Sequence, residues 1–314
     1  MFSHSRINAF KQCPKMYQYK YIDNLEPIGD SEELNLGKAF HRGIELNSVN
    51  ELAKELDEDD YFSSEENETN KVIALAMVEA FLKKFPNHNE GKVEHEVHIE
   101  TNICGEENDF QMYADAIKEV EGGLILREYK TASRIDSVYL DKLEFNDQIS
   151  RYCYVIEKHY KKPIIGIEYY IAKKPLLRQK QSESLEQYRA RLVERLMEDD
   201  NIVYVNLHRT KEQIQESFED MKFDINNINN THRFTQNLSN CSCYGGCPYL
   251  NLCCKKEDAM LLYVKREEND ENDETTKEWK SSPWRKSKCK IMDIWKSKYR
   301  KDNFCKSISR CVND

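Results

Sequence analysis

The stretch Gly123-Leu124-Ile125-Leu126-Arg127-Glu128-Tyr129-Lys130 predicts a β-strand at the centre of this chain. Side chains of a strand alternate between its two faces, so Glu128 and Lys130 project to the same side. Leu124 and Leu126 continue that face, while the odd-numbered side chains take the other. The stretch therefore offers one apolar face that ends in an acid and a base.

A partner strand precedes this stretch. Residues 119–123 are a turn signal with two glycines at the tip, and residues 110–118 carry the period of a second strand. That second strand contains Asp115. An antiparallel hairpin would bring Asp115 near Glu128.

Asp115, Glu128 and Lys130 together have the chemistry of a metal-dependent hydrolytic site. Two carboxylates can hold a hard divalent cation, and an ammonium group nearby can steer the attacking water and stabilise developing negative charge. Charged residues make up 33% of the chain, so the alternative is a solvated hairpin with an ordinary ion pair.

Two predicted helices carry further candidates. Residues 143–161 have apolar positions at helical spacing, and Gln148 and Tyr152 share a face there, placed to contact nucleic acid or to brace the lysine. Residues 33–46 contain His41, whose imidazole is a candidate metal ligand. The alternatives are a core tyrosine beside a surface glutamine, and a structural histidine.

Cysteines form a third signal. The chain has 11, of which five lie between Cys241 and Cys254 and one, Cys13, lies near the N-terminus. Residues 1–20 are polar and basic rather than a signal peptide, so we expect a reducing compartment and metal binding rather than disulfides. Zinc prefers C-x2-C pairs, which are missing, and the irregular spacing favours an iron–sulfur cluster with zinc as the alternative.

Taken in order, these features resemble the RecB-like PD-(D/E)XK nucleases that carry an iron–sulfur staple, as in AddB, CRISPR-adaptation nucleases and phage exonucleases. The resemblance covers about residues 3–254 and includes the opening segment 5–17. Its motifs in chain order are Cys13, Gly37 to His41, Asp115, Glu128 to Lys130, Gln148 to Tyr152, and the C-terminal cysteines.

The resemblance implies an α/β fold. Its core would be restriction-endonuclease-like, a central mixed β-sheet flanked by helices, with an iron–sulfur staple joining the N- and C-terminal regions. It also implies a site in which Mg²⁺ or Mn²⁺ is bound by His41, Asp115, Glu128 and the backbone carbonyl of Tyr129. Lys130 would orient or activate the attacking water. Gln148 and Tyr152 would complete the catalytic motif of the RecB-like branch.

The same resemblance implies a [4Fe-4S] cluster. Its ligands would be Cys13, Cys247 and Cys253 together with one more cysteine. Phage relatives place that cysteine three residues before a Tyr-Gly pair, which selects Cys241, and Cys243 remains the alternative. Cys254 would then be a spare thiol.

The expected function is therefore a metal-dependent DNA exonuclease that acts on single strands or DNA ends in recombination, repair or phage DNA processing. One alternative is a catalytically inactive, nuclease-derived DNA-binding or scaffold protein, and another is a zinc-stabilised nucleic-acid-binding module. Expected partners are DNA and a helicase or recombination protein. We expect no membrane association and a cytoplasmic location in a prokaryotic or phage-infected cell.

Charge and composition divide the chain into three predicted parts, which are a nuclease domain at 1–256, an acidic linker at 257–278 and a basic, aromatic-containing tail at 279–314. The formal net charge is −9, yet residues 280–314 hold 11 Lys or Arg against 3 Asp or Glu. The acidic body does not exclude DNA, because a local basic groove is enough at ordinary salt.

The periodicity predicts an acidic loop at 55–66 and elements arranged around one sheet. Predicted helices lie at about 5–13, 33–47, 67–85, 143–161, 178–198 and 211–229, and predicted strands at about 93–101, 109–119, 124–131, 164–172 and 202–207.

Overall fold

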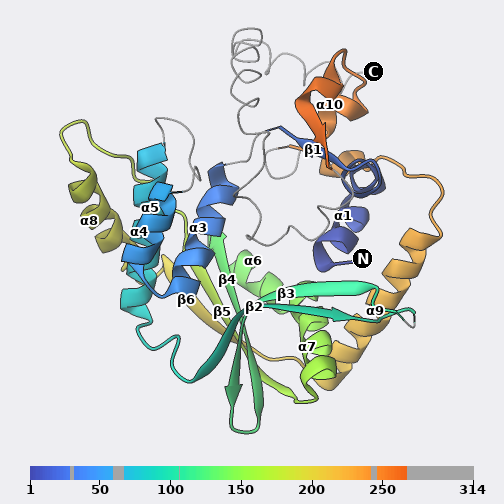
Figure 1. The fold of residues 1–314 in the computed structure, drawn as a ribbon, viewed down its shortest axis with the longest axis horizontal. Helices are drawn as coiled ribbons and strands as arrows, with labels where there is room; N and C mark the ends of the chain where they lie inside the picture. The colour runs from blue at the N-terminus through green and yellow to red at the C-terminus, as the bar shows by residue number, and fades with distance from the viewer. Residues whose placement is uncertain (29–31, 59–66, 106, 242–245, 267–314) are drawn as a thin grey trace.

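A five-stranded mixed sheet forms the centre of the protein in the computed structural model (Figure 1), which describes residues 1–28, 32–58, 67–105, 107–241 and 246–266. The strand order is β2-β3-β4-β5-β6, and β4 pairs with β5 in parallel while the other neighbours are antiparallel. The strands are β2 (Lys92–Thr101), β3 (Phe110–Val120), β4 (Gly123–Ala132), β5 (Ile164–Lys173) and β6 (Ile202–Leu207).

Helices cover both faces of this sheet. Side chains of α3, α4, α5 and α8 pack on one face, and side chains of α1, α7 and α9 pack on the other. The helices are α1 (His4–Gln12), α2 (Pro14–Tyr17), α3 (Glu32–Leu46), α4 (Val49–Glu58), α5 (Asn67–Lys84), α6 (Ser137–Leu143), α7 (Asp147–Tyr160), α8 (Leu185–Leu196), α9 (Lys211–Asn229) and α10 (Leu250–Cys253). This α/β layering is the predicted one, and it is consistent with a restriction-endonuclease-like core.

The alternation read from residues 123–130 is confirmed in the packing of β4. Leu124 and Leu126 are buried in the cluster formed with α1, α7 and α9, whereas Tyr129 is buried in the cluster formed with α3, α5 and α8. Glu128 and Lys130 therefore continue the face that α7 covers, as their even numbering required.

The predicted helix at 143–161 is confirmed as α7, but its predicted start is four residues too early, and the preceding helix α6 was not predicted. The structure has α6 and α7, separated at residues 144–146 by a turn in which the Asn146 side chain accepts the N–H groups of Gln148 and Ile149. An asparagine at this position ends one helix and caps the next, because its side chain replaces the missing helical acceptor.

Two further sequence-based boundaries are wrong. The helix predicted at 178–198 begins only at Leu185, where Ser184 and Gln187 form a capping box. The acidic loop predicted at 55–66 overlaps α4, which reaches Glu58 because Leu52 and Leu56 lie one turn apart and are both buried. The rest of that loop, at 59–66, lies outside the described residues.

A small second sheet joins the beginning and the end of the described chain. It pairs β1 (Leu25–Pro27) with β7 (Tyr263–Lys265) in antiparallel fashion, and the Tyr249 hydroxyl donates to the Leu25 carbonyl at 2.8 Å. The boundary predicted at residue 257 thus precedes a short 3₁₀ helix, Ala259–Leu262, and β7. The predicted linker from residue 267 and the basic tail lie outside the described residues.

No helix in the described ranges is long and apolar enough to cross a membrane.

The β3–β4 hairpin depends on two glycines. Gly122 has a φ of 91°, a backbone conformation that favours glycine. Gly123 lies against the crossover from α7 to β5, and a Cβ atom built there would stand 2.4 Å from the Pro163 carbonyl oxygen. Backbone contacts of this kind leave no room for a side chain.

We therefore predict that Gly123→Ala lowers the free energy of unfolding by about 1–3 kcal/mol, because the added methyl group collides with backbone. Urea denaturation measures the change. The control is Gly166→Ala in β5, where the nearest atom to a built Cβ is 3.9 Å away. Equal stability of the two variants would contradict the close approach.

Candidate metal centre

A local break between β2 and β3 places two acids side by side in the sheet. His95 pairs with Ala116 and Val97 pairs with Ala114, while Glu96 between them adopts a φ of 49°. Apolar side chains of β3 change face at the same point, since Ala114 and Ala116 belong to opposite core clusters. At this break, the side chains of Glu96 and Asp115 therefore depart from the regular alternation of a β-strand between its two faces.

Asp115 is held by contacts from the hairpin and from α3. Its Oδ2 accepts the backbone N–H of Tyr129 at 2.7 Å, and its Oδ1 lies 3.3 Å from Nδ1 of His41. One ligand atom each from His41, Glu96 and Asp115 lie within 4.8 Å of one another. Strand β2, strand β3 and helix α3 each contribute one member of this group.

Glu128 lies beside the group and is almost completely buried. Its side chain is 1% exposed, and neither carboxylate oxygen accepts a well-formed hydrogen bond from the described residues. The Lys130 ammonium lies 2.8 Å from Glu128 Oε2 and 3.7 Å from Asp115 Oδ2. A buried carboxylate with unsatisfied oxygens needs positive charge, and Lys130 supplies only part of it.

The pKa values of these acids follow from their burial first and from the neighbouring charges second. Burial raises the pKa of Asp115, but the charges of Lys130 and His41 outweigh burial, so the pKa is lowered overall. Burial, and then the Asp115 charge, raises the pKa of Glu96 to about 7. Burial raises the pKa of Glu128 to about 7 as well, with Lys130 opposing and Asp115 adding to the shift.

The donor set fits a hard divalent cation. Carboxylate oxygens of Glu96, Asp115 and Glu128 are the ligands that Mg²⁺ and Mn²⁺ prefer, and an imidazole is compatible with Mn²⁺. A cation among them would offset the burial and the Asp115 charge that together raise the pKa values of Glu96 and Glu128. The observation that most directly supports such an ion is the buried Glu128 carboxylate, whose Oε2 has the Lys130 ion pair while Oε1 accepts no hydrogen bond from the described residues.

Gln148 and Tyr152 reach the same site from α7. Tyr152 is buried, and its hydroxyl lies within hydrogen-bonding reach of the Gln148 side chain. Burial, and then the charge of Glu128, raises the pKa of Tyr152. The phenol therefore stays neutral beside the carboxylates.

The structure thus gathers the predicted residues His41, Asp115, Glu128, Lys130 and Tyr152 in one place. The metal-ligand role of the Tyr129 carbonyl and the catalytic roles of the others stay predictions.

Glu96 is a member of the site that the sequence patterns did not predict. It lies in a charged run of β2, where residues 94–98 alternate Glu and His around one valine, and such a pattern is typical of a solvated strand. The signal that distinguishes it is the register that sets it between the pairs flanking Asp115. Sequence spacing does not give that register.

The predicted cysteine ligands also converge. Cys13 is the C-cap of α1, and its sulfur accepts the backbone N–H of Asn237 at 3.4 Å. The Cys247 N–H donates to the Cys241 carbonyl at 2.9 Å. Burial, and then the charges of Cys241, Cys253 and Cys13, raises the pKa of the Cys247 thiol. Cys243 lies outside the described residues.

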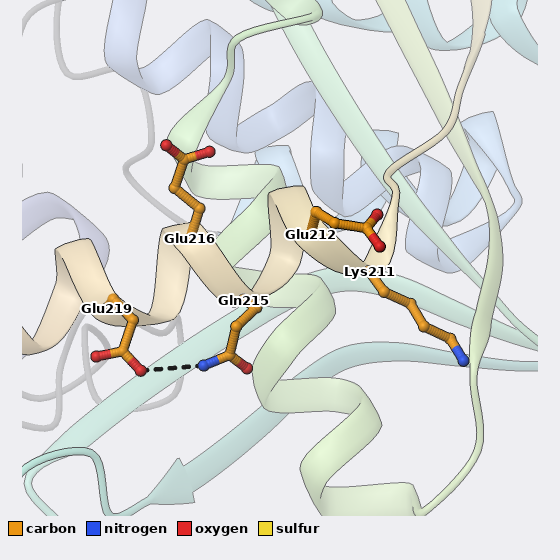
Figure 2. Close-up of a pocket in the computed structure, with 5 residues that line it drawn as sticks. All are labelled: Lys211, Glu212, Gln215, Glu216 and Glu219. Carbon is orange, nitrogen blue, oxygen red and sulfur yellow. Dashed lines mark hydrogen bonds between the residues drawn. The ribbon is translucent and has the colours of Figure 1, made fainter.

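A surface hollow elsewhere has a different character. Figure 2 shows it along α9, lined by Lys211, Glu212, Gln215, Glu216 and Glu219, with a hydrogen bond between Gln215 and Glu219. These side chains follow one helix face toward solvent, and none is among the candidate metal ligands. We assign no chemistry to this hollow.

Comparison with known proteins gives a family for the chain. The family model described as "PD-(D/E)XK nuclease superfamily" matches residues 1–254. No curated protein matches.

Two solved structures are similar at 13% sequence identity each. One is a candidate exonuclease from Eubacterium rectale, with a TM-score of 0.48 over 74% of this chain and 83% of that one. The other is a protein called SSO0001, with a TM-score of 0.33 over 61% of this chain and 80% of that one.

We predict that binding of Mn²⁺ weakens as pH falls through 7. Glu96 and Glu128 must lose their protons to act as ligands, and the pKa of each is raised to about 7 in the metal-free protein. Affinity should therefore fall about ten-fold per carboxyl between pH 8 and pH 6. Isothermal titration calorimetry at pH 6 and at pH 8 measures the dissociation constant of Mn²⁺. The same dissociation constant at both values would contradict a role for these acids.

We also predict that Glu128→Gln stabilises the metal-free protein at pH 8. A carboxyl whose pKa is raised by folding destabilises the fold at pH above its unfolded value, and this cost disappears in acid. Removing the charge should add about 1 kcal/mol or more to the free energy of unfolding at pH 8 and almost nothing near pH 4. Denaturant titrations of wild type and Glu128→Gln at pH 8 and at pH 4 measure the difference in the free energy of unfolding. A less stable variant at pH 8 would show that the Lys130 contact dominates.

Proposed function

We propose, because the chain belongs to the PD-(D/E)XK nuclease superfamily, that it is a Mg²⁺- or Mn²⁺-dependent deoxyribonuclease acting as an exonuclease on single-stranded DNA or DNA ends. The observation that carries the proposal is the convergence of His41, Glu96 and Asp115 beside the buried Glu128 and Lys130. This set contains acids that can hold a divalent cation, an imidazole that can join them, and an ammonium that can stabilise charge on the phosphate.

His41, Glu96, Asp115 and Glu128 would hold the metal. A bound divalent cation supplies polarisation of the scissile phosphoryl oxygen and a lower pKa for its bound water. The hydrogen bond from the Tyr129 backbone to Asp115 fixes that carboxylate before substrate arrives. Such preorganisation lowers the cost of assembling charge at the moment of reaction.

Lys130 is proposed to orient the attacking water and to stabilise charge on the phosphate. Burial lowers its pKa, but Asp115 and Glu128 raise the pKa well above the ordinary lysine value. The side chain is therefore an ammonium, a donor rather than a base. Its place 2.8 Å from Glu128 and 3.7 Å from Asp115 keeps it beside two of the proposed metal ligands.

Gln148 and Tyr152 are proposed to position Lys130 and the substrate strand. Both extend from α7 toward the site, and the neutral phenol lies within electrostatic reach of Lys130 and Glu128. A neutral hydroxyl at this place can donate a hydrogen bond without adding negative charge near a phosphate.

We further propose that Cys13, Cys241, Cys247 and Cys253 bind a [4Fe-4S] cluster that staples the two ends of the nuclease domain. The charges of Cys13, Cys241 and Cys253 raise the pKa of Cys247, and this closeness supports the proposal, as do the hydrogen bonds from Asn237 and Asn240 to the Gln12 carbonyl. The cluster would reinforce a junction already made by β1 and β7. Work in recombination, repair or phage DNA processing, beside a helicase, is part of the same proposal.

We predict that Lys130→Ala lowers the single-turnover rate of cleavage of labelled single-stranded DNA by about 100-fold or more, since the variant loses charge stabilisation at the phosphate. The affinity of Lys130→Ala for Mn²⁺ should stay within a few-fold of wild type. Asp115→Asn should lose both Mn²⁺ binding and DNA cleavage. The control is Lys211→Ala on α9, which should cleave as wild type does. Equal cleavage by Lys130→Ala and wild type would place the reaction elsewhere.

We predict that protein purified without air is brown and contains about four iron atoms per chain. Cys13→Ser, Cys247→Ser and Cys253→Ser should each lose most of the iron, because every ligand is needed to close the cluster. Cys254→Ser is the matched control and should keep it. Comparing Cys241→Ser with Cys243→Ser identifies the fourth ligand. A colourless protein that contains zinc would contradict the cluster.

A further inference from the structure

Phe145 stands out as an apolar side chain in the turn between α6 and α7. It is 85% exposed, although a phenylalanine gains a large free energy from burial. A single exposed apolar residue is ordinary in a soluble protein, so its meaning depends on how it is held and what lies near it.

The backbone on both sides of Phe145 is fixed. The N–H groups of Glu144, Phe145 and Asn146 each donate to carbonyls three residues earlier, at 3.2 Å in every case. The Asn146 side chain then caps α7. A turn bonded in this way fixes the direction in which the Phe145 side chain leaves the backbone.

Arg209 reinforces this turn from another part of the chain. Its Nη2 donates to the Leu143 carbonyl at 2.7 Å, and its Nε donates to the Ser150 hydroxyl at 2.9 Å. Arg209 follows β6 and precedes α9, so the turn is tied to the far edge of the sheet. The ring of Phe145 therefore has a rigid support.

The turn belongs to the surroundings of the metal centre. On α6, Tyr139 feels the Lys130 charge and is within hydrogen-bonding reach of Tyr169. On α7, Tyr152 feels the charges of Glu128 and Lys130. Leu143 and Ile149, on either side of the turn, are buried in the same cluster as Tyr152 and as Leu126 of β4, the strand that carries Glu128 and Lys130.

The charges around the ring indicate which part of a DNA strand it would meet. Charges near the turn are largely balanced, because Asp147 lies 3.6 Å from Lys11 and 3.7 Å from Arg151, and Arg209 bonds to the turn. The turn therefore presents its neutral ring rather than a charge to a strand. A protein-docking patch would need several neighbouring apolar residues, and the residues on either side of Phe145 are polar. The face of a nucleobase is uncharged, and it stacks on aromatic rings.

We propose that Phe145 stacks on an unpaired base of the substrate strand next to the metal centre and so sets a preference for single-stranded DNA. The inference rests on the proposed nuclease function and assigns a specificity residue to it. Stacking would fix the register of the strand, while the scissile phosphate lies at the metal centre.

The test measures, by fluorescence anisotropy, how tightly a fluorescent oligothymidylate binds to the holoprotein. Ca²⁺ replaces Mg²⁺ so that the DNA is not cleaved. Phe145→Ala should bind about 5- to 100-fold more weakly, while Phe145→Trp should retain binding and show fluorescence quenching by the bases. The slope of affinity against salt should not change, because no phosphate contact is lost. The control is Phe223→Ala on α9, where the side chain is 65% exposed.

A second arm moves one abasic site along the oligonucleotide. Wild type should lose affinity at a single position, and Phe145→Ala should show no further loss there, since base and ring act as a pair. If wild type binds and cleaves DNA while Phe145→Ala does both equally well, the inference is overturned and the nuclease stands. If wild type neither binds nor cleaves, the proposed function fails and the inference fails with it.

Discussion

Crowding of carboxylates in a poorly hydrated place is the constraint on which the rest of this site depends. Glu96, Asp115 and Glu128 lie close together, and in the part of the chain that the structure describes His41 and Lys130 provide the opposing charge beside them. The raised pKa values of Glu96 and Glu128 show that the charged form of each carboxyl is unfavourable there. A fold keeps such an arrangement when a cation is bound there, since burying unpaired acids is unfavourable otherwise.

The architecture makes this crowding possible by bringing different layers to one point. β3 and β4 supply Asp115, Glu128 and Lys130, α3 supplies His41 from one side of the sheet, and α7 supplies Tyr152 from the other. The irregular pairing at Glu96 interrupts the strict alternation of a sheet, which would otherwise separate neighbouring side chains onto opposite faces. The candidate metal ligands thus lie where the regular pairing of β2 with β3 is interrupted.

Much of this was predictable from local patterns. Period-two alternation and two glycines are enough to predict the hairpin with Asp115 and Glu128, because strand geometry fixes which side chains share a face. Glu96 was not predictable, since its place depends on the register between β2 and β3 and on a left-handed backbone. The start of α7 had a local signal in Asn146, whose side chain caps the helix, but the predicted start at residue 143 ignores it, and α6 was not predicted.

The most direct test of the metal centre is the anomalous diffraction of crystals soaked in Mn²⁺. The account predicts a manganese peak coordinated by His41, Glu96, Asp115 and Glu128, and its loss in Asp115→Asn crystals that keep the same fold. A peak bound elsewhere, or a site that stays free of manganese in fully soaked wild-type crystals, would contradict the account.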